Sequence, residues 1–289
     1  MHSRSKQSGG KSKSGGGSDT ITKMKEMETA RIQDVIVTLR KAIYDDNGKD
    51  RDLTEKMSHF KTFKKNGIDL ELSFSTKLSP QDAKYCFGQV KENMEELYDN
   101  SGYGWDDDDK RRELSEDGAR FLLIREWPEE EGQELGNLIG FAHFRVTVTG
   151  DFMDEMTGES CLCLWDIHIE EEFQRKGLGK HIVMMLEVMA RSFHIDYVVM
   201  PVMLDDDESE TWMQKLKGYS VARELMSGIG LDSEMEGFSI YAKSIQPVKP
   251  RVAPLADISN KAAIADAAPT ENTEVINTTL KRHLDENRL

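Results

Sequence analysis

A glycine-containing turn at residues 174–180 constrains the fold of this chain more than any other feature. An apolar, strand-like segment at 161–169 precedes it, and residues 181–190 follow it with apolar side chains at helical spacing. A helix that begins directly after such a turn points free backbone N–H groups, and the positive end of its dipole, at whatever lies over the turn. The order strand, glycine turn, helix therefore predicts a site for a phosphate group.

The residues within the turn favour the same ligand. Gly177 and Gly179 let the backbone approach an anion closely because they have no Cβ. Arg175 and Lys176 add positive charge beside them. Neither the Gly-x-Gly-x-x-Gly fingerprint of dinucleotide-binding folds nor a Walker loop is present. The alternative interpretation is a glycine turn that only opens an ordinary helix.

Composition excludes several other classes of protein. The net charge is −15, which opposes direct binding to nucleic acid. The three cysteines include Cys161 and Cys163 on one predicted strand, which indicates reduced thiols of the cytoplasm or nucleus. No Cys/His spacing predicts a metal site, and no charged start with an apolar segment predicts a secretory signal. No run approaches the ~20 apolar residues of a membrane span.

Four parts follow one another along the chain. A basic Gly/Ser/Lys-rich tail at 1–18 is predicted to be disordered, and a helix with its linker occupies 19–54. The main domain spans 55–245, and the polar, proline-containing segment 246–289 is predicted to be disordered as well.

Within the main domain, the periodicity alternates between that of strands and that of helices. The acidic run Asp106 to Asp109 is interpreted as a solvated loop that attracts basic substrates. Pro201 predicts a break in the ladder of its strand. The predicted strands are 70–75, 119–127, 138–148, 161–169 and 197–202, with a closing hairpin of 219–223 and 238–243, and the predicted helices are 80–98, 178–193 and 208–217.

The pattern Gln/Arg-x-x-Gly-x-Gly at 174–179 resembles the acetyl-CoA pyrophosphate loop of the GCN-five-related N-acetyltransferase (GNAT) superfamily. The order of the predicted elements is similar to that of the superfamily too. The resemblance implies an α+β GNAT fold, with a mixed, mostly antiparallel twisted sheet splayed at the acetyl-CoA site. Helices would cover both faces, with an extra N-terminal helix. It also implies acetyl-CoA as the cosubstrate, without a metal.

Within the superfamily, the chain is most similar to the NatD family, which acetylates the amino termini of histones four and two-A. This similarity covers about 55–245. The segments that carry it are 60–66 (Phe-Lys-Thr-Phe-Lys-Lys-Asn), 93–98, 104–105, 110–113 (Lys-Arg-Arg-Glu), 141–145 (Phe-Ala-His-Phe-Arg) and 174–180.

The resemblance implies roles for particular residues. Asp166 stands where the family has its catalytic glutamate, and Asp206 replaces an asparagine that contacts the cofactor. The remaining implied cofactor-binding residues are Ile167, His168, Ile169, Gln174, Arg175, Lys176, Gly177, Leu178, Gly179 and Lys180.

The implied peptide-binding residues match the family less well. Tyr98 matches a tyrosine that contacts the peptide N-terminus, and Tyr103 and Trp165 keep an aromatic character. Thr147 replaces an aspartate that helps to hold the peptide, so selection of the histone tail is less secure. Pro201 stands in place of a threonine, and Phe238 in place of a substrate-binding tyrosine.

The chemistry of acetyl transfer asks for a proton acceptor. An α-amino group has a pKa of about 7.7–8.0, so it is partly neutral at cellular pH and needs only modest help. Asp166 is the first candidate base, directly or through water. Its alternative role is that of a solvent-facing strand carboxylate. Glu170 and His168 are further candidate bases, and Tyr219 is the candidate acid.

These patterns lead to one functional prediction with two alternatives. The prediction is an N-alpha-acetyltransferase of Ser-Gly-Arg-Gly histone-type N-termini, acting by direct attack in a ternary complex. The protein would be a monomer of the cytoplasm and nucleus that binds neither membranes nor nucleic acid. The alternatives are an acetyltransferase of other N-termini, lysine or small amines, and a catalytically weak acyl-CoA-binding or chromatin-interaction protein.

Overall fold

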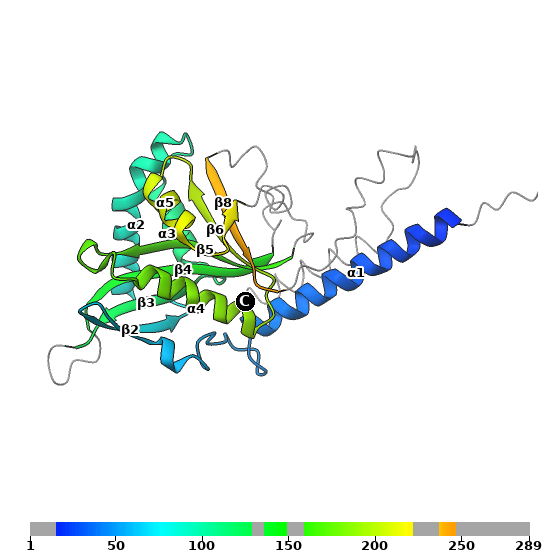
Figure 1. Ribbon diagram of the computed structural model, residues 1–289, viewed down its shortest axis with the longest axis horizontal. Helices are drawn as coiled ribbons and strands as arrows, with labels where there is room; N and C mark the ends of the chain where they lie inside the picture. The colour runs from blue at the N-terminus through cyan, green and yellow to red at the C-terminus, as the bar shows by residue number, and fades with distance from the viewer. Residues whose placement is uncertain (1–15, 129–135, 149–158, 222–236, 247–289) are drawn as a thin grey trace, which may run out of the picture.

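The computed structural model describes residues 16–128, 136–148, 159–221 and 237–246 (Figure 1). The predicted elements between 70 and 243 are confirmed within the described residues, which exclude 222–223 of the predicted hairpin, whereas β1 and α3 were not predicted. The elements are α1 (Gly16–Ile43), β1 (Thr62–Lys65), β2 (Ile68–Ser75), α2 (Pro80–Asn100), α3 (Asp107–Ser115), β3 (Arg120–Glu126), β4 (Leu138–Val148), β5 (Ser160–Ile169), α4 (Leu178–Ser192), β6 (Tyr197–Met203), α5 (Asp207–Lys215), β7 (Ser220–Val221) and β8 (Phe238–Ser244).

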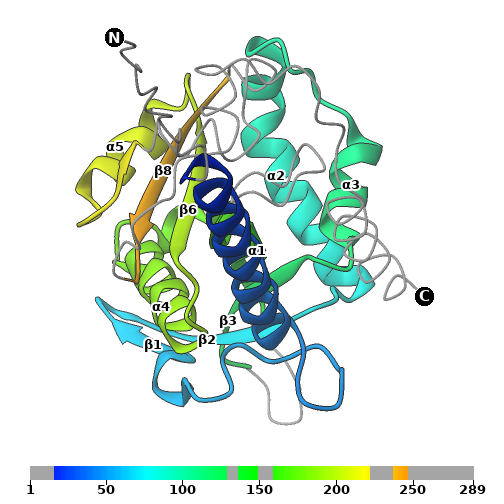
Figure 2. The same ribbon diagram turned by 90° about the vertical axis from the view of Figure 1, so that its right-hand side faces the viewer.

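The strands form one sheet in the order β1-β2-β3-β4-β5-β6-β8-β7. Among the strands that the structure describes, only β5 and β6 are parallel, so the sheet is mixed and mostly antiparallel, as predicted. Helices cover both of its faces, with α2 and α3 on one side and α4 on the other (Figure 2). Along β3, Leu122 and Ile124 join the core under α4, whereas Phe121 and Leu123 join the core under α2. This split follows from the two-residue period of a strand.

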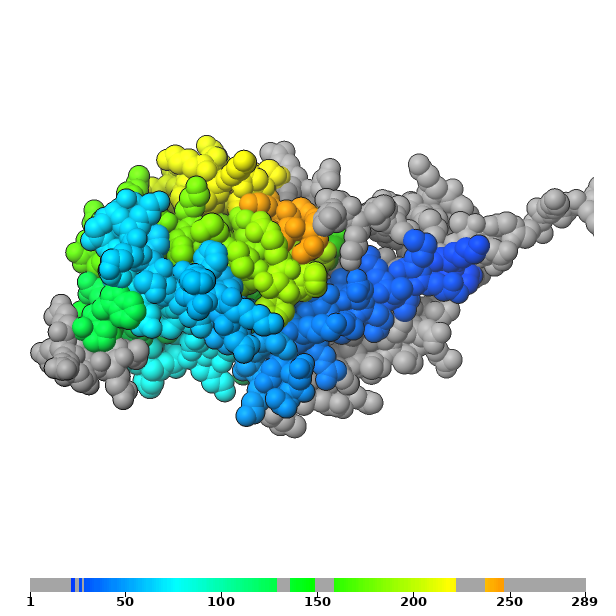
Figure 3. All heavy atoms as spheres, turned by 60° about the horizontal axis from the view of Figure 1, so that its bottom comes forward, coloured from blue at the N-terminus to red at the C-terminus, as the bar shows by residue number. Residues whose placement is uncertain are grey.

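The hairpin of β1 and β2 braces the glycine turn. Asn66 and Gly67 have φ values of 54° and 82°, which suit the two-residue turn that matches strand twist. The ring of Phe63 packs edge-on against His181 of α4, with 5.2 Å between the centroids. The Asn66 side-chain amide donates to the Lys176 carbonyl at 2.8 Å. Figure 3 shows this blue segment lying against the yellow-green α4.

Helix α1 projects from the body of the molecule, and its C-terminal half packs on the core (Figure 1). Val35 and Ala42 are buried, and Leu39 and Ile43 pack against the core under α4. The helix begins at Gly16, inside the tail predicted for residues 1–18, while residues 1–15 and 247–289 lie outside the described residues. Within the described chain, no helix is both long and apolar enough to span a bilayer.

Candidate active site

The sheet opens between β5 and β6. These strands pair in parallel only from Cys161 to Cys163, opposite Tyr197 to Val199, and then they part. On its other edge, β6 stays paired with β8 through Pro201 to Met203. The predicted splay is therefore confirmed, and the ladder break expected at Pro201 lies on the β5 side alone.

A β-bulge turns the end of β5 towards α2. The register with β4 pairs His143 with Asp166 but Phe144 with Leu164, so Trp165 is an extra residue on β5. A bulge re-aims the side chains that follow it. Trp165 packs against the same buried cluster as Met94 and Tyr98 of α2, and Asp166 also turns to the face that α2 and α3 cover. The predicted base, Asp166, and the aromatic ring of Trp165 thus lie on the same face of the sheet.

The splay opens into a cavity of about 410 Å³. Most of the residues around it come from β5, β6, α2 and α5. Among the predicted site residues, those that line it are Tyr98, Trp165, Asp166, Ile167, His168, Ile169, Gln174, Pro201, Asp206 and Phe238. The lining residues that were not predicted are Asn93, Met94, Leu97, Lys110, Leu164, Met200, Val202, Met203, Glu208, Ser209, Trp212 and Met213.

The other predicted residues lie outside the cavity lining. Tyr103 is half exposed, and its ring packs edge-on against Tyr98 and Phe238. Thr147 pairs with Cys161 away from the opening. The turn residues 175–180 follow Gln174 directly at the rim.

The glycine turn has the geometry of an anion site. Gly177 is the N-cap of α4 with φ 93°, and no atom lies within 4 Å of where a Cβ would stand. In the part of the chain that the structure describes, no acceptor takes the backbone amides of residues 175–180. A Cβ on Gly179 would lie 3.3 Å from the Trp212 indole, so glycine allows α5 to pack there. The turn therefore offers unpaired donors to a phosphate group.

Helix α3 corrects the interpretation of Asp106 to Asp109 as a loop. The Asp106 carboxylate caps the helix by accepting from the amides of Asp108 and Asp109, at 2.8 and 2.9 Å. The helix buries Lys110 beside the cavity, where its Nζ lies 2.9 Å from Glu113 and 3.6 Å from Asp166. Sequence reasoning missed this lysine because it stands within a run of charged residues.

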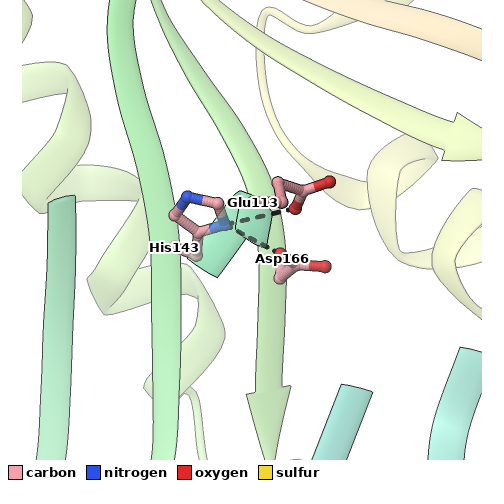
Figure 4. A group of neighbouring side chains, drawn as sticks. All are labelled: Glu113, His143 and Asp166. Carbon is pink, nitrogen blue, oxygen red and sulfur yellow. Dashed lines mark hydrogen bonds and ion pairs between the residues drawn. The ribbon is translucent and has the colours of Figure 1, made fainter. Parts of the chain in front are cut away.

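Glu113, His143 and Asp166 form a compact cluster (Figure 4), of which Asp166 lines the cavity. His143 is fully buried, and its Nδ1 lies 2.9 Å from Asp166 and 3.7 Å from Glu113. Three such ligands suit a metal ion, yet both carboxylates already pair with the Lys110 ammonium. We therefore interpret the cluster as an ion-pair network.

This network determines the charge of Asp166. Burial raises the pKa of the carboxyl group, but the Lys110 ammonium and the His143 hydrogen bond outweigh it and hold the pKa well below its usual range. Asp166 therefore stays ionised at neutral pH. It is not the solvent-facing carboxylate of the alternative interpretation, because only 8% of the residue is exposed.

The remaining acid–base candidates differ in their surroundings. His168 is buried in the cavity wall, and its Nδ1 lies 3.0 Å from the Asn93 amide nitrogen. Glu170 accepts from the Tyr85 hydroxyl at 3.0 Å and is not among the lining residues. The Tyr219 hydroxyl donates to Glu187, also outside the cavity, which leaves no role for it as the acid.

Aromatic rings form one wall of the cavity. The Tyr98 ring meets Tyr103, Trp105 and Phe238 edge-on, with centroid distances of 5.7–6.3 Å. The Lys110 ammonium lies 5.6 Å from the Tyr98 ring centroid. Burial raises the pKa of Tyr98 to about 12, so its hydroxyl stays protonated. The wall is therefore an aromatic surface in which Tyr98 carries a protonated hydroxyl group.

Comparisons with known proteins agree with this geometry. Residues 90–219 match the acetyltransferase (GNAT) family model. Similar solved structures include a GNAT acetyltransferase from Listeria monocytogenes (15% identity, TM-score 0.41, 63% of this chain and 99% of that one). They also include PaiA N-acetyltransferase from Thermoplasma acidophilum with coenzyme A (14%, 0.38, 60% and 99%). A third is Arabidopsis thaliana NAA60 with a bisubstrate analogue (12%, 0.38, 61% and 99%).

At these identities and TM-scores, the solved structures carry no argument about substrate. The family model supports acetyl transfer as the class of reaction, and the site geometry is compatible with it. The match begins within α2 and ends just before β7, so it spans the splayed strands and the glycine turn. Residues 90–219 therefore match the acetyltransferase (GNAT) family model, in an α+β fold with a mixed, mostly antiparallel sheet, and the cosubstrate of that family is acetyl-CoA.

Proposed function

We propose that this protein is a protein N-alpha-acetyltransferase of NatD type, which acetylates Ser-Gly-Arg-Gly histone-type N-termini. It acts as a monomer in the cytoplasm and nucleus. The observation that carries the proposal is the aromatic wall of Tyr98, Trp165 and Phe238 in the cavity beside the splayed end of β5. An aromatic-lined cavity of this kind suits an extended chain end with small first residues.

Direct attack of the amine on the thioester fits the residues in the cavity. The three cysteines are buried, and burial raises the pKa of the Cys86 and Cys163 thiols, which makes both poor nucleophiles. None of the cysteines lines the cavity. An acyl-enzyme route through cysteine therefore has no support, and the ternary complex remains the proposed route.

Asp166 acts in this proposal mainly through its charge. A carboxylate whose pKa is held well below the usual range is a weak proton acceptor. It stabilises positive charge on the attacking amine, and water carries the proton away. The loss of the family's aspartate at Thr147 leaves acidic residues at the rim, such as Asp206 and Glu208, to attract the arginine of the substrate.

A panel of N-terminal peptides tests the proposal. We expect acetylation of Ser-Gly-Arg-Gly peptides, and at least tenfold lower kcat/KM, about 1.4 kcal/mol, when the third residue is glutamate, because the cavity rim is acidic. Mass spectrometry should place the acetyl group on the α-amine. A peptide with a blocked N-terminus and a free lysine is the control.

Other results of this peptide panel would indicate a different function. Equal activity on acidic and basic N-termini, or modification of the lysine, would contradict the NatD assignment and favour a broader acetyltransferase. Silence on every amine, with tight acetyl-CoA binding in a titration, would instead indicate an acyl-CoA-binding protein.

Removal of the Tyr98 ring should damage peptide use more than cofactor use. We expect Tyr98→Ala to raise the peptide KM about tenfold, because an aromatic contact of this size contributes roughly 1–1.5 kcal/mol beyond its buried area. Tyr98→Phe, which keeps the ring, should change the KM much less. The binding of acetyl-CoA, followed by calorimetric titration, should stay the same in both variants. A Tyr98→Ala protein with an unchanged peptide KM would place the peptide elsewhere.

A further inference from the structure

His168 of β5 lies in the wall of the cavity, close to Asp166. It follows Asp166 by two residues, beyond the bulge, and lies on the part of β5 that no longer pairs with β6. Only 8% of the residue is exposed, and its ring packs against Phe141 at 5.5 Å between centroids. The ring is therefore fixed in place and faces the cavity in which the acyl group must lie.

The neighbour on α2 determines which ring nitrogen carries the proton. The Asn93 amide nitrogen lies 3.0 Å from Nδ1 of His168, and an amide nitrogen can only donate. Nδ1 must then accept, so the proton of the neutral ring sits on Nε2. Within the described residues, Nε2 has no hydrogen-bond partner, and it is not sealed from the cavity. A donor without a partner in such a cavity suits a ligand acceptor.

We propose that the Nε2–H group of neutral His168, oriented by Asn93, donates a hydrogen bond to the acyl carbonyl oxygen of acetyl-CoA. The inference rests on the proposed acetyl transfer and adds a catalytic residue to it. His168 is the donor to the developing oxyanion, and Asn93 is the positioning residue that selects the tautomer.

The charges around the ring are consistent with a neutral imidazole. Burial lowers the pKa of His168, and the Asp166 carboxylate opposes this effect only in part. The Lys110 ammonium lowers the pKa further, and Asp206 at the start of α5 raises it. The other titratable groups on this side of the sheet include Tyr98 on α2, Glu113 on α3, His143 on β4 and Glu208 on α5.

The chemical step balances with these groups alone. The neutral amine attacks the carbonyl carbon, the carbon–oxygen π pair moves to oxygen, and Nε2–H stabilises the resulting oxyanion. The carbonyl then re-forms, the carbon–sulfur bond breaks, and coenzyme A leaves with the electron pair. The amine releases its proton to water, and the thiolate takes one from water.

Asn93→Asp separates this role from that of a general base. In the neutral ring, an aspartate at 93 accepts from Nδ1–H, which moves the proton off Nε2 and removes the donor. The added carboxylate also raises the pKa of the imidazole, so the variants are compared at alkaline pH, where the ring is neutral. If His168 donates to the oxyanion, kcat should fall about tenfold or more in Asn93→Asp and about 100-fold in His168→Leu. If His168 is a general base, Asn93→Asp should raise kcat instead. Gln89→Glu adds the same charge one turn earlier on α2 and serves as the matched control.

A spectroscopic readout keeps the test independent of turnover. An analogue of acetyl-CoA with a ¹³C-labelled ketone in place of the thioester binds without reacting. Its carbonyl resonance should move downfield on binding to the wild-type protein and to Gln89→Glu. His168→Leu and Asn93→Asp should each lose a large part of that shift while the affinity for coenzyme A itself stays the same.

The outcomes distinguish the two proposals. An unchanged carbonyl shift in His168→Leu, or a faster Asn93→Asp protein, overturns the donor role. A wild-type protein that shows the histidine-dependent shift but acetylates no peptide N-terminus contradicts the proposed function and supports the donor role.

Discussion

Gly177→Val should weaken acetyl-CoA binding about 100-fold. The backbone at Gly177 has φ 93°, a conformation that a β-branched residue rarely adopts. The strain would rotate the unpaired amides of residues 175–180 away from the phosphates. The loss of two charge-assisted hydrogen bonds, about 1.5 kcal/mol each, corresponds to a loss of this size. Calorimetric titration with acetyl-CoA measures it directly.

Gly48→Val is the matched control for this substitution. Gly48 also has a positive φ, 76°, and no atom lies within 4 Å of where its Cβ would be. It sits in the turn that the Asp45 side chain closes, and it does not line the cavity. The two variants should lose similar stability, yet only Gly177→Val should lose acetyl-CoA affinity. Equal affinities in both would refute the assignment of the glycine turn as the pyrophosphate site.

Lys110→Met should destabilise the protein by about 3 kcal/mol. The removal of one partner from a buried ion pair leaves the other charge uncompensated, and such changes cost roughly 3–5 kcal/mol. Both Lys110 and Asp166 have side chains only 7% exposed, and Glu113 depends on the same ammonium. Urea unfolding, followed by circular dichroism, measures the free energy of unfolding.

Lys91→Met provides the comparison at the surface. Lys91 also pairs with two carboxylates, Glu95 and Asp107, but all three side chains are more than a third exposed. Solvent screens such pairs, so the loss of stability should be much smaller. If the two methionine variants unfold at the same urea concentration, the buried network does not have the stabilising role assigned to it.

The same network predicts how stability responds to acid. The pKa of Asp166 is lower in the folded chain than its unfolded value of about 3.9, so the unfolded chain binds more protons at acidic pH. Its contribution to stability is present above that value and is lost as the pH falls towards the folded pKa. In Lys110→Met the pKa of Asp166 in the folded chain should rise. The free energy of unfolding should then depend less on pH in the acidic range.

Much of the fold could be predicted from local patterns. Alternation marked β2, and loops rich in Glu, Gly and Asp marked the limits of β3, β4 and β5. Ser79 followed by Pro80 marked the start of α2, where Ser79 accepts from the Asp82 amide at 3.1 Å. The hairpin of β1 and β2 was missed, although Asn66-Gly67 is a strong turn signal. Its strands lie next to lysines that obscure the apolar pattern.

The sequence by itself determined the order of the elements and the glycine turn, because helical and strand periods and turn residues are local properties. The tertiary structure alone decided which groups meet at the reacting centre. The bulge at Trp165 depends on the register with β4, and the α3 helix that delivers Lys110 to Asp166 depends on an aspartate cap within an acidic run. Asn93 and His168 lie 75 positions apart, and only the packing of α2 on the sheet brings them together. Such contacts are set by the non-local pairing of strands and helices, which no short pattern of residues records.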